Sequence, residues 1–132
     1  MPESNTPLQC LIPLLQVGDM SDTLTYYREA LGFQPDFTWP DAESPKWARV
    51  SRDGVSLMFT VDLGTSSGLF IAEKGNGVVF YLIVADVEAA YEELVARGAI
   101  IVQDVHDFGG RKQFSVADNN GYVLAISEAF AP

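Results

Sequence analysis

The sequence repeats itself at an interval of 67 residues. Three pairs of equivalent landmarks are separated by that interval: Val17 and Val84, Asp19 and Asp86, and Gly54 and Gly121. A repeated supersecondary unit predicts two similar modules, because one such unit cannot bury its apolar face alone. The 132 residues are enough for both modules within a single domain, spanning 1–132.

The first half reads as a strand, a helix and three further strands. The strands are predicted over residues 10–17, 33–39, 47–51 and 55–61. Asp19 is placed to cap the helix and Gly32 to end it. The helix should bury an apolar face made of Met20, Leu24, Tyr27 and Leu31. Asp53-Gly54 is a hairpin signal between the last two strands.

The second half follows the same order. Its strands are predicted over residues 78–84, 100–105, 112–117 and 122–127. Asp86 caps a helix that ends at Gly98, with Val87, Ala90, Tyr91 and Leu94 facing inward. Module one then spans residues 8–63 and module two 78–128, with 64–77 as a linker whose apolar stretch 69–72 should pack on the protein. The expected fold class is α+β, with two tandem βαβββ modules forming a curved mixed sheet around a cleft.

Composition limits the classes of binding partner and the cellular compartment that we expect for this chain. With 8 basic and 18 acidic side chains the net charge is −10, which argues against nucleic acid and anionic membranes and favours cationic ligands. No apolar run approaches the ~20 residues of a membrane span, and the first residues do not resemble an export signal. We therefore expect a cytoplasmic protein. The single cysteine, Cys10, has no internal disulfide partner and is expected to be buried.

Two motifs carry a resemblance to a known family. The first is Val17-Gly18-Asp19-Met20 followed by Tyr26-Tyr27 and Ala30-Leu31-Gly32-Phe33, and the second runs from Phe114 to Tyr122. Together they resemble the vicinal oxygen chelate superfamily, which includes glyoxalase I, extradiol dioxygenases, fosfomycin resistance enzymes and bleomycin resistance proteins. Asn119 replaces the proline that is usual in the second motif. The resemblance covers almost the whole chain and implies the glyoxalase/bleomycin-resistance-like fold.

The resemblance also implies where a metal would bind. Metal-using members place ligands on the first and last strands of each module, and the aligned residues here are Ile12, Met58, Val79 and Ala125. All four are apolar, so we expect no metal and no cofactor. A surface site at His106 with Asp104 and Asp107 is an alternative, although a lone histidine in a loop is normally solvated. No nucleophile–base spacing is present, so no catalytic residue is assigned.

Strand alternation and strand position predict the ligand-binding residues. They are Leu14, Trp39, Trp47, Arg49, Met58, Tyr81, Gln113 and Ser115. Each tryptophan either stacks on a ligand or packs in the core or a dimer interface. Arg49 either faces a carboxylate or an anionic ligand group, or is an edge residue whose charged head reaches solvent.

Three functions follow, and the leading one is a binding protein. The resemblance to bleomycin resistance proteins implies a metal-free homodimer with grooves between subunits and a charge suited to a cationic drug. We expect such a protein to sequester a small, partly aromatic ligand, with a cation among the alternatives. The second hypothesis is a lyase, isomerase or dioxygenase of the same superfamily, and the third is an interaction module. The sequence does not identify the ligand or tie the chain to drug resistance.

Overall fold

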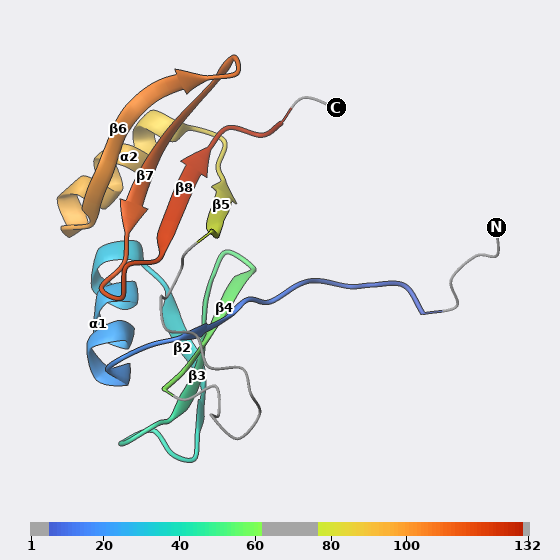
Figure 1. The fold of residues 1–132 in the computed structure, drawn as a ribbon, viewed down its shortest axis with the longest axis vertical. Coiled ribbons are helices and arrows are strands. Elements are labelled where there is room, and N and C mark those ends of the chain that lie inside the picture. Colours follow the sequence, from blue (N-terminus) through green and yellow to red (C-terminus); the bar gives the residue numbers. More distant parts are fainter. Residues whose placement is uncertain (1–5, 62–76, 131–132) are drawn as a thin grey trace.

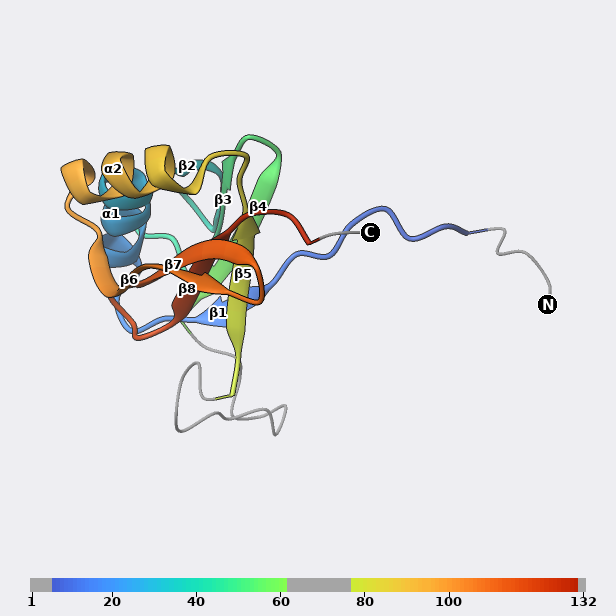
Figure 2. The same cartoon turned by 90° about the horizontal axis from the view of Figure 1, so that it is seen from above.

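A computed structural model describes residues 6–61 and 77–130. Within these ranges the chain forms two four-stranded sheets, each with a helix on one face (Figure 1). The helices α1 and α2 lie side by side, on the same side of the two sheets (Figure 2). This confirms the predicted α+β class with two βαβββ modules. Neither helix in the described ranges is long and apolar enough to cross a membrane.

Module one contains one helix and the sheet β1-β4-β3-β2. Its elements are β1 (Leu14–Gln16), α1 (Met20–Leu31), β2 (Gln34–Trp39), β3 (Trp47–Arg52) and β4 (Val55–Thr60). The predicted cap is present, since Asp19 accepts a hydrogen bond from the backbone of Asp22 at 2.8 Å. The hairpin between β3 and β4 turns at Asp53 and Gly54, both with positive φ, as the Asp-Gly signal predicted.

Module two repeats this order in the sheet β5-β8-β7-β6. Its elements are β5 (Val79–Ile83), α2 (Val87–Arg97), β6 (Ile100–Phe108), β7 (Arg111–Ala117) and β8 (Val123–Ser127). Asp86 caps α2 by accepting from the backbone of Ala89 at 3.0 Å. Both helices end at a glycine with left-handed φ, Gly32 and Gly98, as predicted.

The 67-residue repeat is visible in the hydrogen bonds. Val17 N donates to Thr60 O and Val84 N donates to Ser127 O, each at 2.9 Å. The interval falls to 66 residues after the helix, because α1 has 12 residues and α2 has 11. It returns to 67 at the last strand of each module. The chain between equivalent paired positions of β7 and β8 is one residue longer than the chain between those of β3 and β4. Both differences in length lie outside the strands. Equivalent side chains of the two modules therefore point to the same side of their sheets.

The predicted bounds were wrong at two strands. β1 begins at Leu14 and not at Cys10, because the ladder to β4 ends where Met58 N donates to the carbonyl of Pro13. The first described residues run away from the sheets (Figures 1 and 2). Cys10 is exposed, so the expectation of a buried thiol was wrong.

β6 is longer than predicted and runs to Phe108. Gly109 and Gly110, both with positive φ, make a tight turn that extends the β6–β7 hairpin. His106 therefore lies within a strand and not in a loop. Apart from Gly77, the predicted linker 64–77 falls outside the described residues, and so does its apolar stretch 69–72.

The modules are joined by polar contacts between α1 and the turn that follows β7. Tyr27 donates its hydroxyl to Asp118 at 2.7 Å, and both residues are buried. Burial, together with the negative charge of Asp118, raises the pKa of Tyr27 well above its usual value. Tyr26 donates to the carbonyl of Ala117 at 2.7 Å, so module one reaches module two through two neighbouring tyrosines.

Candidate functional site

Each sheet has one face covered by a helix and a second face that we call the open face. Side chains that face the helices are almost fully buried: Ala48, Val50, Leu57, Phe59, Phe114, Val116, Leu124 and Ile126. Their neighbours in sequence point the other way. The open face is made of Leu14, Trp47, Arg49, Ser51, Ser56, Met58 and Thr60 in module one, and of Val79, Tyr81, Ile83, Gln113, Ser115, Val123, Ala125 and Ser127 in module two.

An aromatic cluster occupies the open face of module one. Phe37 and Trp47 make an edge-to-face contact with ring centroids 5.3 Å apart. Trp39 is paired with Trp47 across the β2–β3 ladder and is 58% exposed. These three rings line a hollow of about 350 Å³ together with Lys46, Thr60 and Val61. The hollow therefore offers ring surfaces to a planar group.

Arg49 lies beside this cluster and has a partner within the chain. Its Nε donates to Asp36 Oδ1 at 2.8 Å, and Ser51 donates to the other oxygen at 2.7 Å. The guanidinium of Arg49 holds the pKa of Asp36 below its usual value. Arg49 thus has the carboxylate partner that was one of the two expectations, and it does not need an anionic ligand.

A second cluster lies on the open face of module two and is built around the C-terminal segment. The guanidinium of Arg111 lies over the ring of Phe130, 3.9 Å from its centroid. Tyr81 contacts the same ring, with centroids 5.9 Å apart, and its hydroxyl lies 3.4 Å from Gln113 Oε1. Arg111 Nε is buried and has no hydrogen-bond partner among residues 6–61 and 77–130. The face therefore already holds an aromatic ring, and it offers an unused donor beside that ring.

The four apolar residues at the family's metal positions lie on or next to the paired strands β1 and β4 in module one and β5 and β8 in module two. Met58 is paired with Leu14, and Ala125 is paired with Tyr81, in equivalent parallel ladders. Ile12 precedes β1, and Val79 begins β5. Among residues 6–61 and 77–130, no group of three or more His, Cys, Asp or Glu side chains is placed to hold a metal ion. The ring of His106 contacts the carbonyl of Asp104 at 2.9 Å.

Comparisons with known proteins place this fold in a family. The model described as "Glyoxalase/Bleomycin resistance protein/Dioxygenase superfamily" matches residues 9–126. The chain belongs to this superfamily. The resemblance inferred from the two motifs is thereby confirmed. No curated protein sequence matches this superfamily member.

Solved structures show the same fold at low sequence identity. TioX from Micromonospora sp. ML1 is 19% identical with a TM-score of 0.70, covering 94% of this chain and 98% of that one. TnmS3, an antibiotic binding protein from Streptomyces sp. CB03234, is 18% identical with a TM-score of 0.72, covering 96% and 100%. A glyoxalase-related enzyme from Fulvimarina pelagi is 21% identical with a TM-score of 0.73, covering 92% and 88%. Binding proteins and enzymes share this superfamily fold, so the fold alone does not choose between them.

The structure separates the predicted ligand residues into two groups. Trp39, Trp47, Arg49, Leu14 and Met58 lie in module one, and Tyr81, Gln113 and Ser115 lie in module two. Gln113 and Ser115 are both buried, so they contribute little surface to a ligand.

Sequence reasoning missed four residues of these clusters. Alternation gave a usable signal for two of them, since Phe37 stands two residues before Trp39 and Arg111 two before Gln113. Asp36 occupies an irregularity in the β2–β3 pairing, which alternation does not reveal. Phe130 lies beyond the predicted end of module two, and no local pattern shows that the chain returns to the sheet.

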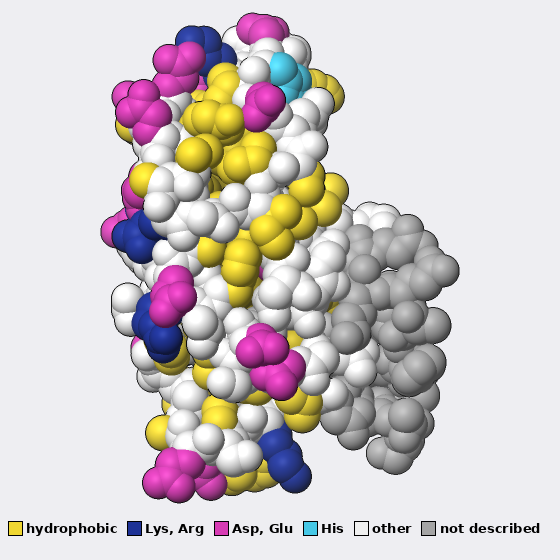
Figure 3. Space-filling model, turned by 90° about the vertical axis from the view of Figure 1, so that its left-hand side faces the viewer, with side chains coloured by type: hydrophobic (Ala, Val, Ile, Leu, Met, Phe, Trp, Pro, Cys, Tyr) yellow, Lys and Arg dark blue, Asp and Glu magenta, His cyan; other side chains and the backbone are white. Residues whose placement is uncertain are grey.

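The face of the molecule shown in Figure 3 carries charged side chains of both signs. Asp and Glu side chains stand at separate places over the face shown in Figure 3, with Lys and Arg side chains among them. Among the described residues, the charges beside the two aromatic clusters include Arg49 with Asp36, Lys46 and Arg111. The net charge of −10 therefore acts at long range, while the local groups beside the aromatic rings are largely cationic.

Proposed function

We propose that this superfamily member is a metal-free binding protein that sequesters a small, partly aromatic molecule on its open faces, and that it acts in the cytoplasm. The observation that carries the proposal is the ring of Phe130 held between Arg111 and Tyr81. A planar ligand ring can take the place of Phe130, and a ligand oxygen can accept from Arg111 Nε. Apolar side chains at all four metal positions support binding over metal-dependent catalysis.

The same contacts predict which kind of polar group the ligand carries. Arg49 is already paired with Asp36, whereas Arg111 Nε has no partner in the described part of the chain. The ligand should therefore present an acceptor, such as a carbonyl or phenol oxygen. The acidic chain as a whole would speed the approach of a cation without adding much affinity.

Calorimetric titration with 2-naphthol, a planar ring carrying one oxygen, tests this proposal. Tyr81→Ala should weaken binding at the module-two cluster several-fold, and Trp47→Ala should do so at the hollow of module one, because each removes a ring surface from its own open face. Val95→Ala, on the exposed side of α2, is the matched control and should bind like the parent. Phe130→Ala should bind more tightly, since it removes the competing ring. Equal affinity in all four variants would contradict the proposed site.

A second copy of the chain is the partner that we propose for the open faces. Leu14, Val79, Tyr81 and Ile83 are all more than 40% exposed there, which leaves an apolar surface to be covered. A symmetric homodimer would pair identical faces and enclose the rings. Light scattering at micromolar concentration should report twice the mass of one chain. A monomer at that concentration would rule out this arrangement.

The alternative, a lyase, isomerase or dioxygenase of the same superfamily, requires a metal held elsewhere. Elemental analysis of the purified protein discriminates between the two. One tightly bound transition metal per chain, lost when residues of the open face are changed, would favour the enzyme.

A further inference from the structure

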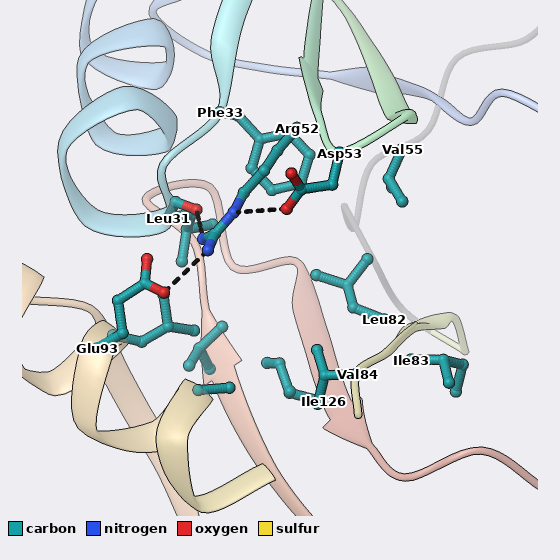
Figure 4. A pocket seen from close by; sticks show the side chains of 13 residues that line it. Leu31, Phe33, Arg52, Asp53, Val55, Leu82, Ile83, Val84, Glu93 and Ile126 are labelled. Atoms are coloured by element: carbon teal, nitrogen blue, oxygen red, sulfur yellow. Dashed lines mark hydrogen bonds and ion pairs between the residues drawn. The ribbon is translucent and has the colours of Figure 1, made fainter. Parts of the chain in front are cut away.

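A cavity of about 190 Å³ lies at the seam between the two modules. Module one contributes Leu31, Phe33, Arg52, Asp53 and Val55 to its wall, and module two contributes Leu82, Ile83, Val84, Ala90, Glu93, Leu94, Val116 and Ile126 (Figure 4). We call it the seam cavity. Val116 and Ile126 belong to the helix-facing side of their sheet, so most of the seam cavity lies on the other side of the sheet from the open face of module two. Ile83, at the end of β5, is the one residue of the open faces that also lines the cavity.

The repeat explains why the cavity exists. In module one, three buried rings fill the core, with Tyr27 4.7 Å from Phe59 and 5.9 Å from Phe33. The equivalent residues of module two are Leu94, Ile126 and Ala99. The hydrogen bonds confirm this alignment, since Phe33 N donates to Tyr27 O and Ala99 N donates to Leu94 O.

Module two places its own rings elsewhere. Tyr91 and Phe114, with centroids 5.1 Å apart, stand where module one has Leu24 and Ala48. The pairing across the sheet shows the exchange, because Ala48 faces Phe59 and Phe114 faces Ile126. Two rings thus replace three, and they pack against each other at different positions of the module. The missing ring corresponds to the empty volume beside Leu94 and Ile126.

The polar groups at the rim of the seam cavity already have hydrogen-bond or ion-pair partners within the protein. Arg52 donates to Leu31 O at 2.8 Å and to Glu93 at 2.9 Å, and its Nε lies 3.4 Å from Asp53 (Figure 4). A ligand therefore needs no polar group to satisfy them. An engineered apolar cavity of about 150 Å³ binds benzene. The seam cavity is open to solvent on the side of Val55 and Ile83, which are exposed, and its volume is sufficient for one such ring. We propose that the seam cavity is a second binding site, for a neutral compound with a single aromatic ring, independent of the proposed function of the open faces.

Titration with toluene, followed by NMR of the Leu, Val and Ile methyl groups, tests this inference. Toluene should shift the methyl signals of Leu82, Leu94, Val116 and Ile126 and raise the melting temperature of the protein. Leu94→Phe should weaken toluene binding by about tenfold or more, since the new ring occupies the cavity. If Leu94→Phe does not fold, Ala90→Leu fills the same space from the same helix.

Two control variants keep this site distinct from the open faces. Trp47→Ala should leave toluene affinity unchanged, and Leu94→Phe should leave 2-naphthol affinity unchanged. The inference is overturned if toluene leaves the cavity methyl groups unshifted, or if it binds the filled variant as well as the parent. It is also overturned if Trp47→Ala removes toluene binding, because the ring would then lie on an open face.

Discussion

At the scale of single residues, the hydrogen bond donated by the Tyr27 hydroxyl has a clear expected effect on the free energy of unfolding. The hydroxyl donates to Asp118 inside the protein, where the same carboxylate also accepts from the backbone of Asn120 and Tyr122. Tyr27→Phe would leave a buried carboxylate with one donor fewer. We expect a loss of about 1–3 kcal/mol in the free energy of unfolding, measured by urea denaturation.

Tyr91→Phe is the matched control for this change. Tyr91 also donates to a carboxylate, Asp104, at 2.8 Å, but that contact is exposed to solvent. Its loss should leave the urea midpoint nearly unchanged, since water replaces the partner. Equal effects of the two substitutions would show that burial of Asp118 is not what gives the Tyr27 contact its strength.

At the scale of elements, the two helices start in the same way. Asp19 and Asp86 occupy equivalent positions and accept from backbone groups at 2.8 and 3.0 Å. Each Asp→Ala substitution should cost about 1 kcal/mol, whereas Asp→Asn should cost less because an acceptor remains. Circular dichroism during urea unfolding checks this. A much smaller cost at Asp86 than at Asp19 would show that α2 depends less on its cap.

The elements show which parts of the fold were predictable from sequence. Helix bounds were predictable because Asp19, Gly32, Asp86 and Gly98 are local signals. Strand faces followed from alternation. Strand bounds were less predictable. The first residue of β1 depends on the ladder that this strand forms with β4, and the local pattern does not show that ladder. The candidate site was predictable only in part for the same reason, because the position of Phe130 depends on a distant contact with Arg111.

At the scale of the whole molecule, an ion pair crosses the seam between the modules. Arg52, at the end of β3, forms an ion pair with Glu93 of α2. Glu93 also accepts a hydrogen bond from Arg97 at 2.8 Å. Hydrogen bonds from these two guanidinium groups lower the pKa of Glu93 below its usual value. A lowered pKa means that the pair stabilises the folded state above the ordinary glutamate pKa, and that this contribution is lost as pH falls through the folded value.

Glu93→Gln should therefore destabilise the protein at neutral pH, and the difference from the parent should shrink in acid. The effect is modest because both side chains are about one-third exposed, at 32% and 38%. Urea midpoints measured across the acidic range give the comparison. A difference that stays constant with pH would show that the charge of Glu93 is not what stabilises the seam.

The distribution of tryptophan gives the two aromatic clusters different optical signatures. Both tryptophans of the chain, Trp39 and Trp47, line the hollow of module one, and the cluster of module two contains only tyrosine and phenylalanine rings. Emission excited at the red edge of the indole band therefore reports on module one alone. A compound that quenches this emission has reached the hollow of module one. A compound that binds by calorimetry without quenching occupies another site, so a single spectrum locates a ligand before any crystal is grown.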